Sequence, residues 1–303
     1  MKISILSDKF LSEKKAIGYK YECASQHMKQ FLNMIKDIDS SELSEKLILD
    51  YVHDSPTNAT RINKMKTLNQ FIKWINSNGY LCPVHVLNIK VKNDSTFVPY
   101  IYTKDEVREI LQLARKTEYK NISGETTYMV LLVMYATGMR LGEILHLRIN
   151  DVDFDENGFN VKFTKFNKSR FVPFGNNLRT ALINYSSKCM DSKNNKSFFI
   201  TRDGCEIKIY QMEHVFDRRI RPFIKIRKDF HATPRMHDLR HTFVMRRLIS
   251  WYQEGVDIND ALPLLSTYIG HLDLNGTKRY ITMTPELLRE ANRKFEKFIG
   301  EES

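Results

Sequence analysis

The sequence predicts a mainly helical protein with one small antiparallel β-sheet, arranged as a helical N-terminal domain followed by a larger, mostly helical domain. Two patterns indicate this fold class. Apolar residues recur every three or four positions through most of the first hundred residues, and again beyond residue 175. Between residues 151 and 174, apolar and polar residues alternate around the turn-forming pair Asn157-Gly158. The fold class is therefore α+β, with helices dominant.

Four helices are expected in the first domain. Ser7-Asp8 opens the first, and helical spacing of apolar residues marks two more over 21–38 and 44–52. The fourth, over 58–76, has the clearest apolar stripe, and Asn78-Gly79 ends it. The stripe consists of Ile62, Met65, Leu68, Phe71, Ile72 and Ile75.

The helical periodicity fades between about residues 87 and 100, which places a domain boundary there. We expect a helical domain over 1–95 and a second domain over 96–303. In the second domain, Thr103 to Glu106 has the pattern of a capping box for a helix ending near Arg115. Further helices are expected over 126–136, from Arg140, and over 177–188, 210–226, 237–252, 259–269 and 285–298.

Composition and charge restrict the class of protein. The 303 residues include 47 Lys and Arg against 36 Asp and Glu, a net charge of +11 that favours nucleic acid or another polyanionic partner. No apolar run is long enough to span a membrane, and the N-terminus lacks the pattern of a secretion signal. The four cysteines are scattered, which argues against disulfides and a zinc site. We therefore expect a cytoplasmic protein without a metal.

Four short segments carry residues suited to chemistry. They are Thr137-Gly138-Met139-Arg140-Leu141-Gly142-Glu143, the stretch around Lys165 in the predicted sheet, His237-Asp238-Leu239-Arg240-His241, and Gly270-His271 followed nine residues later by Tyr280. Each segment alone is unspecific, since a single arginine is more often a surface residue and a single tyrosine more often part of the core. Their order along the chain makes the set specific.

Together the segments resemble the active site of the tyrosine recombinase family, also called lambda-integrase-like. Its pattern is an arginine, a lysine in a β-turn, His-x-x-Arg, a histidine or tryptophan, and a tyrosine. This sequence matches it with Arg140, Lys165, His237, Arg240, His271 and Tyr280. Residues 1–95 resemble the family's helical core-binding domain, so the resemblance covers nearly the whole chain. Phe166 departs from the family, which often has glycine after the lysine.

The resemblance implies a site-specific DNA recombinase that works without metal, ATP or another cofactor. Tyr280 would be the nucleophile and form a 3′-phosphotyrosine ester, with Arg140 and Arg240 on the non-bridging phosphate oxygens. His237 would act as general base, Lys165 would protonate the 5′-oxygen, and His271 would bind the phosphate. Glu143, one helical turn from Arg140, is expected to orient its guanidinium. Tyr252 and Tyr268 lie nearby, but only Tyr280 has the family's spacing after the histidine.

Double-stranded DNA is the expected partner. Residues 218–247 contain ten basic residues against two acidic ones, which suits phosphate contacts, and the helix over 58–76 adds a basic face. The family resemblance implies a monomer that forms a homotetramer on two DNA duplexes, linked by helix 285–298, with possible accessory DNA-bending proteins at the nucleoid. The expected DNA-binding residues are Arg61, Lys64, Lys66, Arg218, Arg219, Arg221, Lys225, Arg246 and Arg247.

Several functions stay open at the level of sequence. The long stretch between Arg240 and His271 favours an integrase of a transposon or other mobile element, while Xer-like resolution of DNA dimers is the alternative. A type IB topoisomerase uses similar chemistry, and a non-catalytic DNA-binding regulator would need no such set of residues. RNA or membrane binding lacks the aromatic platforms or amphipathic basic helix that it requires.

Overall fold

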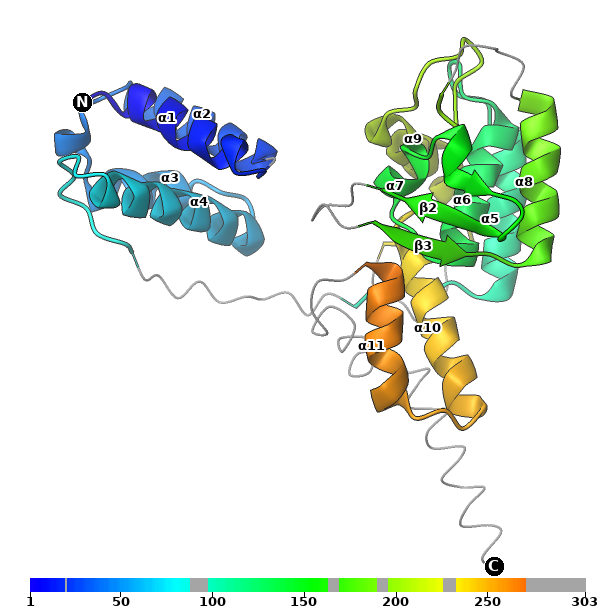
Figure 1. Ribbon diagram of the computed structural model, residues 1–303. Helices are drawn as coiled ribbons and strands as arrows, with labels where there is room; N and C mark the ends of the chain where they lie inside the picture. The colour runs from blue at the N-terminus through cyan, green and yellow to red at the C-terminus, as the bar shows by residue number, and fades with distance from the viewer. Residues whose placement is uncertain (20, 88–97, 163–168, 190–195, 226–232, 271–303) are drawn as a thin grey trace, which may run out of the picture. The chain divides into compact units, whose positions relative to one another are not determined.

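The computed structural model describes residues 1–19, 21–87, 98–162, 169–189, 196–225 and 233–270 of the 303-residue chain. The chain divides into two compact units, Met1–Phe97 and Val98–Ser303. Figure 1 shows both units, with the α-helices and the strands β2 and β3 labelled. The mainly helical fold with a small antiparallel sheet, which the sequence predicted, is confirmed.

The described part of the first unit contains four α-helices: α1 (Ile3–Ala16), α2 (Glu22–Ile35), α3 (Glu45–His53) and α4 (Asn58–Ser77). The first was expected to open at Ser7 but begins four residues earlier, because Ile3 and Leu6 are both fully buried and extend its apolar face. The four helices pack around one core that includes Phe10, Phe31 and Phe71.

The second unit holds the helices α5 (Lys104–Lys116), α6 (Gly124–Thr137), α7 (Leu141–Leu145), α8 (Asn176–Cys189), α9 (Ile209–Val215), α10 (Asp238–Gln253) and α11 (Ile258–Ile269). The capping box is confirmed at the start of α5. The backbone N–H of Glu106 donates to Thr103 Oγ1 at 3.1 Å, and the backbone N–H of Thr103 donates to Glu106 Oε2 at 2.7 Å. The helix expected over 210–226 is shorter than predicted. Beyond α9 the chain forms a wider π-type turn and then a 3₁₀ turn that contains Pro222, which has no N–H to continue a helix.

Three short strands form the sheet: β1 (Val152–Asp153), β2 (Gly158–Val161) and β3 (Arg170–Pro173). They pair antiparallel in the order β1-β2-β3, with Phe159 opposite both Val152 and Val172. Gly158 lets the Phe171 ring pack against its backbone, since a Cβ there would lie 2.0 Å from that ring and would displace it. Strand β2 ends at Val161 and strand β3 begins at Arg170, on either side of the segment that contains Lys165.

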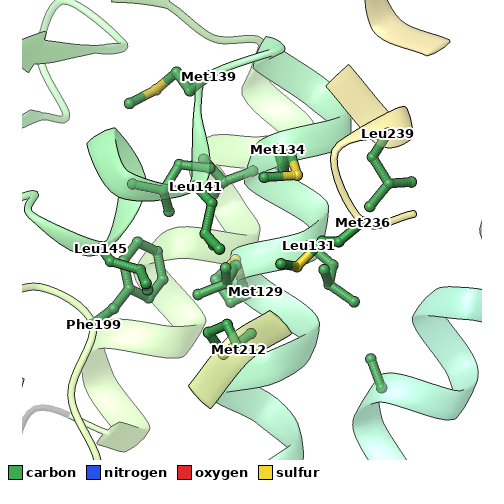
Figure 2. Packing of buried hydrophobic residues seen from close by; sticks show 14 of the residues in the cluster. Met129, Leu131, Met134, Met139, Leu141, Leu145, Phe199, Met212, Met236 and Leu239 are labelled. Carbon is green, nitrogen blue, oxygen red and sulfur yellow. The ribbon is translucent and has the colours of Figure 1, made fainter. Parts of the chain in front are cut away.

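A methionine-rich core lies beneath the segments that carry the predicted active-site residues. Figure 2 shows part of this cluster, which includes Met129, Leu131, Met134, Met139, Leu141, Met212, Met236 and Leu239. Met139 and Leu141 flank Arg140, and Met236 lies beside His237 in sequence. Burial of these apolar neighbours anchors the backbone on both segments.

The helices α10 and α11 lie side by side, and the C-terminal end of α11 reaches β3 (Figure 1). A separate apolar cluster holds the two helices together, through Val244 and Leu248 from α10 and Leu262, Leu265 and Ile269 from α11. In the part of the chain that the structure describes, none of the helices is both long and apolar enough to cross a membrane.

Candidate active site

Arg140 lies at the sharp turn between α6 and α7. Gly138 ends α6 in the left-handed conformation, with φ +64°, and Arg140 then occupies the N-cap position of α7. The backbone N–H of Arg140 donates to Glu143 Oε2 at 3.0 Å, which closes the first turn of the helix. Both sequence neighbours of Arg140 are buried, whereas its own side chain is 29% exposed.

Glu143 holds two guanidinium groups on one carboxylate. Arg140 Nη1 donates to Oε1 at 3.0 Å, and Arg170 donates to Oε1 at 3.1 Å and to Oε2 at 2.8 Å. Burial alone raises the pKa of Glu143, but the hydrogen bonds and charge of Arg170, and then those of Arg140, outweigh it, so the pKa lies below its ordinary value. The carboxylate is therefore ionised at neutral pH. Its expected role as a partner of Arg140 fits this geometry.

Arg240 is almost completely buried, at 1% exposure, in the first turns of α10. Its Nη1 donates to the Gly138 carbonyl at 2.5 Å, and its Nη2 donates to the Ile269 carbonyl at 2.7 Å. It therefore joins the turn before Arg140 to the end of α11. A buried guanidinium needs such acceptors because removing its charge from water is otherwise costly.

Three guanidiniums bind three successive carbonyls at the end of α11. Arg170 Nε donates to Tyr268 O at 2.8 Å, Arg240 Nη2 to Ile269 O at 2.7 Å, and Arg140 Nη2 to Gly270 O at 2.8 Å. The last carbonyls of a helix lack intrahelical partners and carry partial negative charge, so cations suit this position. We call this arrangement the α11 clamp. Residue 271 follows it directly in the chain.

His237 is exposed at the N-cap position of α10, three residues before Arg240. Its ring meets that of His241 edge to face, with centroids 5.0 Å apart. The start of the helix is held by Asp238, which is 1% exposed and accepts from the backbone N–H of Arg235 at 2.8 Å. Burial is the main cause of the raised pKa of Asp238. Among the described residues, no three His, Cys, Asp or Glu side chains cluster as metal ligands would.

Comparison with known proteins identifies the family. The sequence profile of the phage integrase family matches residues 101–286, which is more than half of the chain. The chain belongs to the phage integrase family. It is a tyrosine recombinase, an enzyme that breaks and rejoins DNA in site-specific recombination.

Among the relatives of this recombinase, a Sinorhizobium fredii protein named as an integrase/recombinase, y4rB, is 27% identical over 303 residues, with 95% of each chain covered. Tyrosine recombinase XerC of Staphylococcus aureus is 26% identical over 246 residues, covering 80% of this chain and 76% of XerC. The Tn1549 transposon integrase, solved in complex with transposon right end DNA, is 14% identical with a TM-score of 0.70, covering 98% of this chain and 99% of that one. Lambda integrase, solved as a dimer on a core site, has a TM-score of 0.67 at 16% identity, covering 90% and 96%. Both structures share the fold.

Three of the predicted catalytic residues of the recombinase, Lys165, His271 and Tyr280, lie outside the described residues, as does the predicted helix 285–298. The structure describes the residues on both sides of the Lys165 segment and the residue directly before His271. Strand β3 begins shortly after the segment containing Lys165, and α11 ends directly before His271. Arg140 and Arg240 both bind carbonyls at the end of α11, directly before His271.

Tyr268, the nearest competitor for the role of nucleophile, has other contacts. Its ring stacks on Phe243, with centroids 5.7 Å apart, and its hydroxyl is directed to the Pro173 carbonyl at 3.5 Å. Burial raises its pKa to about 12. Tyr268 therefore takes part in the packing of the second unit, and Tyr280 remains the predicted nucleophile.

The expected DNA-binding residue Lys64 needs correction. It is 7% exposed, and its Nζ donates to the carbonyls of Tyr51 and Asp54, both at 3.1 Å, while lying 3.9 Å from the centre of the Tyr51 ring. Its ammonium therefore caps the end of α3 inside the unit rather than facing a phosphate. Arg61 is half-buried and donates to Asn58 and to the His53 carbonyl, whereas Lys66 is exposed.

The expected basic residues of the second unit differ in their surroundings. Arg246 is half-buried and bonds the Tyr135 hydroxyl and the Tyr102 carbonyl, and Arg221 forms an ion pair with Asp217 at 3.0 Å. The side chains that the solvent reaches most freely are Arg218, Arg219, Lys225 and Arg247.

Arg170 has contacts that the sequence did not assign. It lies within the motif around Lys165, but no role follows from its sequence position alone. One signal was present. In a strand, residues two apart share a face, and Arg170 shares its face with the fully buried Val172. A charged residue on the buried face of a strand needs a partner, which here is Glu143.

Proposed function

We propose that Arg140, Lys165, His237, Arg240, His271 and Tyr280 form the active site of this recombinase. One observation carries the proposal. Arg140 and Arg240, which come from separate elements, bind the adjacent carbonyls of Gly270 and Ile269, and so lie together directly before His271. Two guanidiniums beside each other suit the non-bridging oxygens of one phosphodiester, where charge accumulates in the transition state.

In the proposed reaction the Tyr280 oxygen attacks the scissile phosphorus. His237 takes the phenol proton, and Lys165 gives a proton to the departing 5′-oxygen. The products are a 3′-phosphotyrosine ester and a free 5′-hydroxyl. Because the ester conserves the phosphodiester bond, attack by another 5′-hydroxyl reverses the step and rejoins a strand, without ATP. Arg140, Arg240 and His271 hold the phosphate throughout.

The partner is double-stranded DNA, on which the protein assembles as an oligomer. The exposed basic side chains Lys66, Arg218, Arg219, Lys225 and Arg247 are the proposed phosphate contacts, with Arg61, Arg221 and Arg246 in supporting positions. A homotetramer that forms from monomers on two duplexes, with helix 285–298 as the link and accessory bending proteins, is the proposed assembly. We place this activity at the nucleoid, where chromosomal DNA lies.

Integration and excision of a mobile element is the biological role that we favour, since the Tn1549 transposon integrase matches nearly the whole length of this fold. Resolution of DNA dimers is the second candidate, because XerC is 26% identical to this chain. A plasmid with two sites in direct repeat separates recombination from topoisomerase activity. A recombinase converts this plasmid into two smaller circles. A topoisomerase relaxes it without changing its size, as it would also relax a plasmid with one site.

The test of the active site is a nicked suicide duplex from the ends of the host element. Wild type, Tyr280→Phe and Tyr268→Phe are incubated with it in EDTA and analysed on a denaturing gel. We expect a covalent protein–DNA band from wild type and Tyr268→Phe, and none from Tyr280→Phe. A band from Tyr280→Phe would contradict the assigned nucleophile. A wild-type band that forms without EDTA but not in its presence would contradict a metal-free reaction.

A further inference from the structure

Arg170 is an arginine on the inner face of strand β3, with its side chain only 11% exposed. Its position follows from the pairing of β3 with β2, which places Arg170 opposite Val161 and directs Val172 into the core. An arginine in such a place is stable only when its donors are matched, since a buried and unpaired guanidinium is costly.

All three kinds of nitrogen on the Arg170 guanidinium have an acceptor. Nη1 and Nη2 bind the two carboxylate oxygens of Glu143, at 3.1 and 2.8 Å, as a parallel fork. Nε binds the Tyr268 carbonyl at 2.8 Å. The fork fixes the plane of the carboxylate, whereas a single bond would leave it free to rotate.

The carboxylate that Arg170 orients is the one that holds Arg140. Glu143 Oε1 accepts from Arg140 Nη1 at 3.0 Å, and Oε2 accepts from the Arg140 backbone at 3.0 Å. If the fork were lost, Glu143 would keep only its two hydrogen bonds to Arg140, and the Glu143–Arg140 pair would no longer be tied to strand β3. The second contact of Arg170 acts on the other side of the site, where it holds the end of α11.

Close packing at Gly270 shows how tightly this end is held. A Cβ built on Gly270 would lie 2.8 Å from Arg170 Nη1 and 3.2 Å from Arg140 Nη1. The backbone therefore passes directly against both guanidiniums. A shift of Arg170 changes the space available to the residue that leads into His271.

We propose that Arg170 is a positioning residue of the cleavage reaction. It sets the direction of the Arg140 guanidinium through Glu143, and it sets the end of α11 before His271 through the Tyr268 carbonyl. This inference rests on the proposed function, which assigns Arg140 and His271 to the active site.

The test separates positioning from binding and from simple loss of structure. Single-turnover cleavage of the suicide duplex at saturating enzyme is measured for wild type, Arg170→Gln, Arg170→Lys, Glu143→Gln and the double variant Arg170→Gln/Glu143→Gln. DNA affinity of each is measured by gel retardation. The matched control is Arg179→Gln, because Arg179 also donates Nε to a backbone carbonyl, that of Phe154 at 3.0 Å, but has none of the contacts of the α11 clamp.

We expect Arg170→Gln to slow cleavage by about 10²-fold, the usual loss when one element of transition-state stabilisation is removed, while DNA affinity stays within about threefold. Arg170→Lys retains the charge without the fork and regains part of the rate. The double variant should be no slower than the slower single variant, since both changes break the same connection. The control should cleave at the wild-type rate.

Cleavage by Arg170→Gln or Arg170→Lys at the wild-type rate would overturn the inference. It would also be overturned if the fold-loss in cleavage rate of the double variant equalled the product of the two single losses. Should Arg170→Gln fail to fold, Arg170→Lys provides the same comparison. Thermal unfolding of the same variants tests the pairing apart from catalysis. If the shifts of the melting temperature for Arg170→Gln and Glu143→Gln added up in the double variant, the inference would be contradicted. A wild-type enzyme that forms no covalent band would contradict the proposed function instead.

Discussion

Glu143 connects the electrostatics of the site with the stability of the fold. Its side chain is 9% exposed and is the acceptor for Arg140 and Arg170 at once. Removing the charge of one member of such a buried set leaves the other charges without compensation. The carboxylate therefore contributes to stability only while it is ionised.

We expect Glu143→Gln to lower the free energy of unfolding at pH 7 by about 3 kcal/mol, the scale for breaking a buried ion pair. The pKa of Glu143 is lower in the folded protein than in the unfolded chain, where it is about 4.3. The contribution is thus complete above the unfolded pKa and disappears as pH falls through the folded pKa. Thermal unfolding from pH 7 to pH 3 should show the difference between the two proteins shrinking at acidic pH.

The matched control for this measurement is Glu213→Gln, since Glu213 is exposed on α9 and should show no such difference. Asp238 titrates in the opposite sense. Its pKa is raised by burial, so its contribution is lost as pH rises through the folded pKa, but this effect is present in both proteins and cancels. A difference that stays constant down to pH 3 would contradict the assigned role of Glu143.

Helix α11 ends in the α11 clamp, where its last carbonyls accept hydrogen bonds from three guanidiniums. Gly270 adopts φ +70°, and its Cα faces the two guanidiniums at close range. Gly255, after the end of α10, has a similar φ of +78° but no atom within 4 Å of a Cβ built there. The two glycines thus differ in close contacts and not in backbone conformation.

We expect Gly255→Ala to cost about 1–2 kcal/mol, the penalty of an L-residue in the left-handed region, and to leave cleavage unchanged. Gly270→Ala should cost more, because the new methyl group displaces Arg170, and should slow cleavage by about tenfold or more. Melting temperatures and single-turnover rates of both variants check this. Equal effects of the two substitutions would show that the close approach to the guanidiniums is unimportant.

Helix α4 shows how a local pattern can be misjudged. Its apolar stripe predicted the helix, whose bounds differ from the expected 58–76 by one residue. Lys64 nevertheless lies on the buried stripe, four and seven residues before Leu68 and Phe71. Helical spacing alone thus placed it inside the unit, and the basic residue type wrongly indicated the surface. Its stem is buried among apolar side chains and its ammonium finds carbonyl acceptors.

At the scale of the whole molecule, two compact units carry separate parts of the proposed function. Met1–Phe97 has its own apolar core of four helices, and Val98–Ser303 contains all the proposed catalytic residues. A unit with its own core can fold independently. Basic residues proposed to contact DNA are present in both.

We expect a fragment of residues 98–303 to remain folded but to bind the target duplex about tenfold more weakly or worse, because the phosphate contacts of the first unit are lost. The logarithm of the association constant should also depend less steeply on the logarithm of the salt concentration, by about 0.9 for each contact removed. Gel retardation at several salt concentrations measures both quantities, and circular dichroism verifies the fold. Unchanged affinity and salt dependence would contradict a role for residues 1–97 in DNA binding.

The sequence by itself predicted most of the described helices, a small antiparallel sheet and the resemblance to the family, because periodicity, turn residues and motif order are local properties that each segment carries alone. It also indicated the pairing of Arg140 with Glu143, which are one helical turn apart. Only the tertiary structure decided the carbonyl partners of Lys64, the fork between Arg170 and Glu143, and the three guanidiniums on the end of α11. Arg140 and Gly270 are 130 residues apart, and their contact depends on how separate helices and a strand pack, which no local pattern encodes.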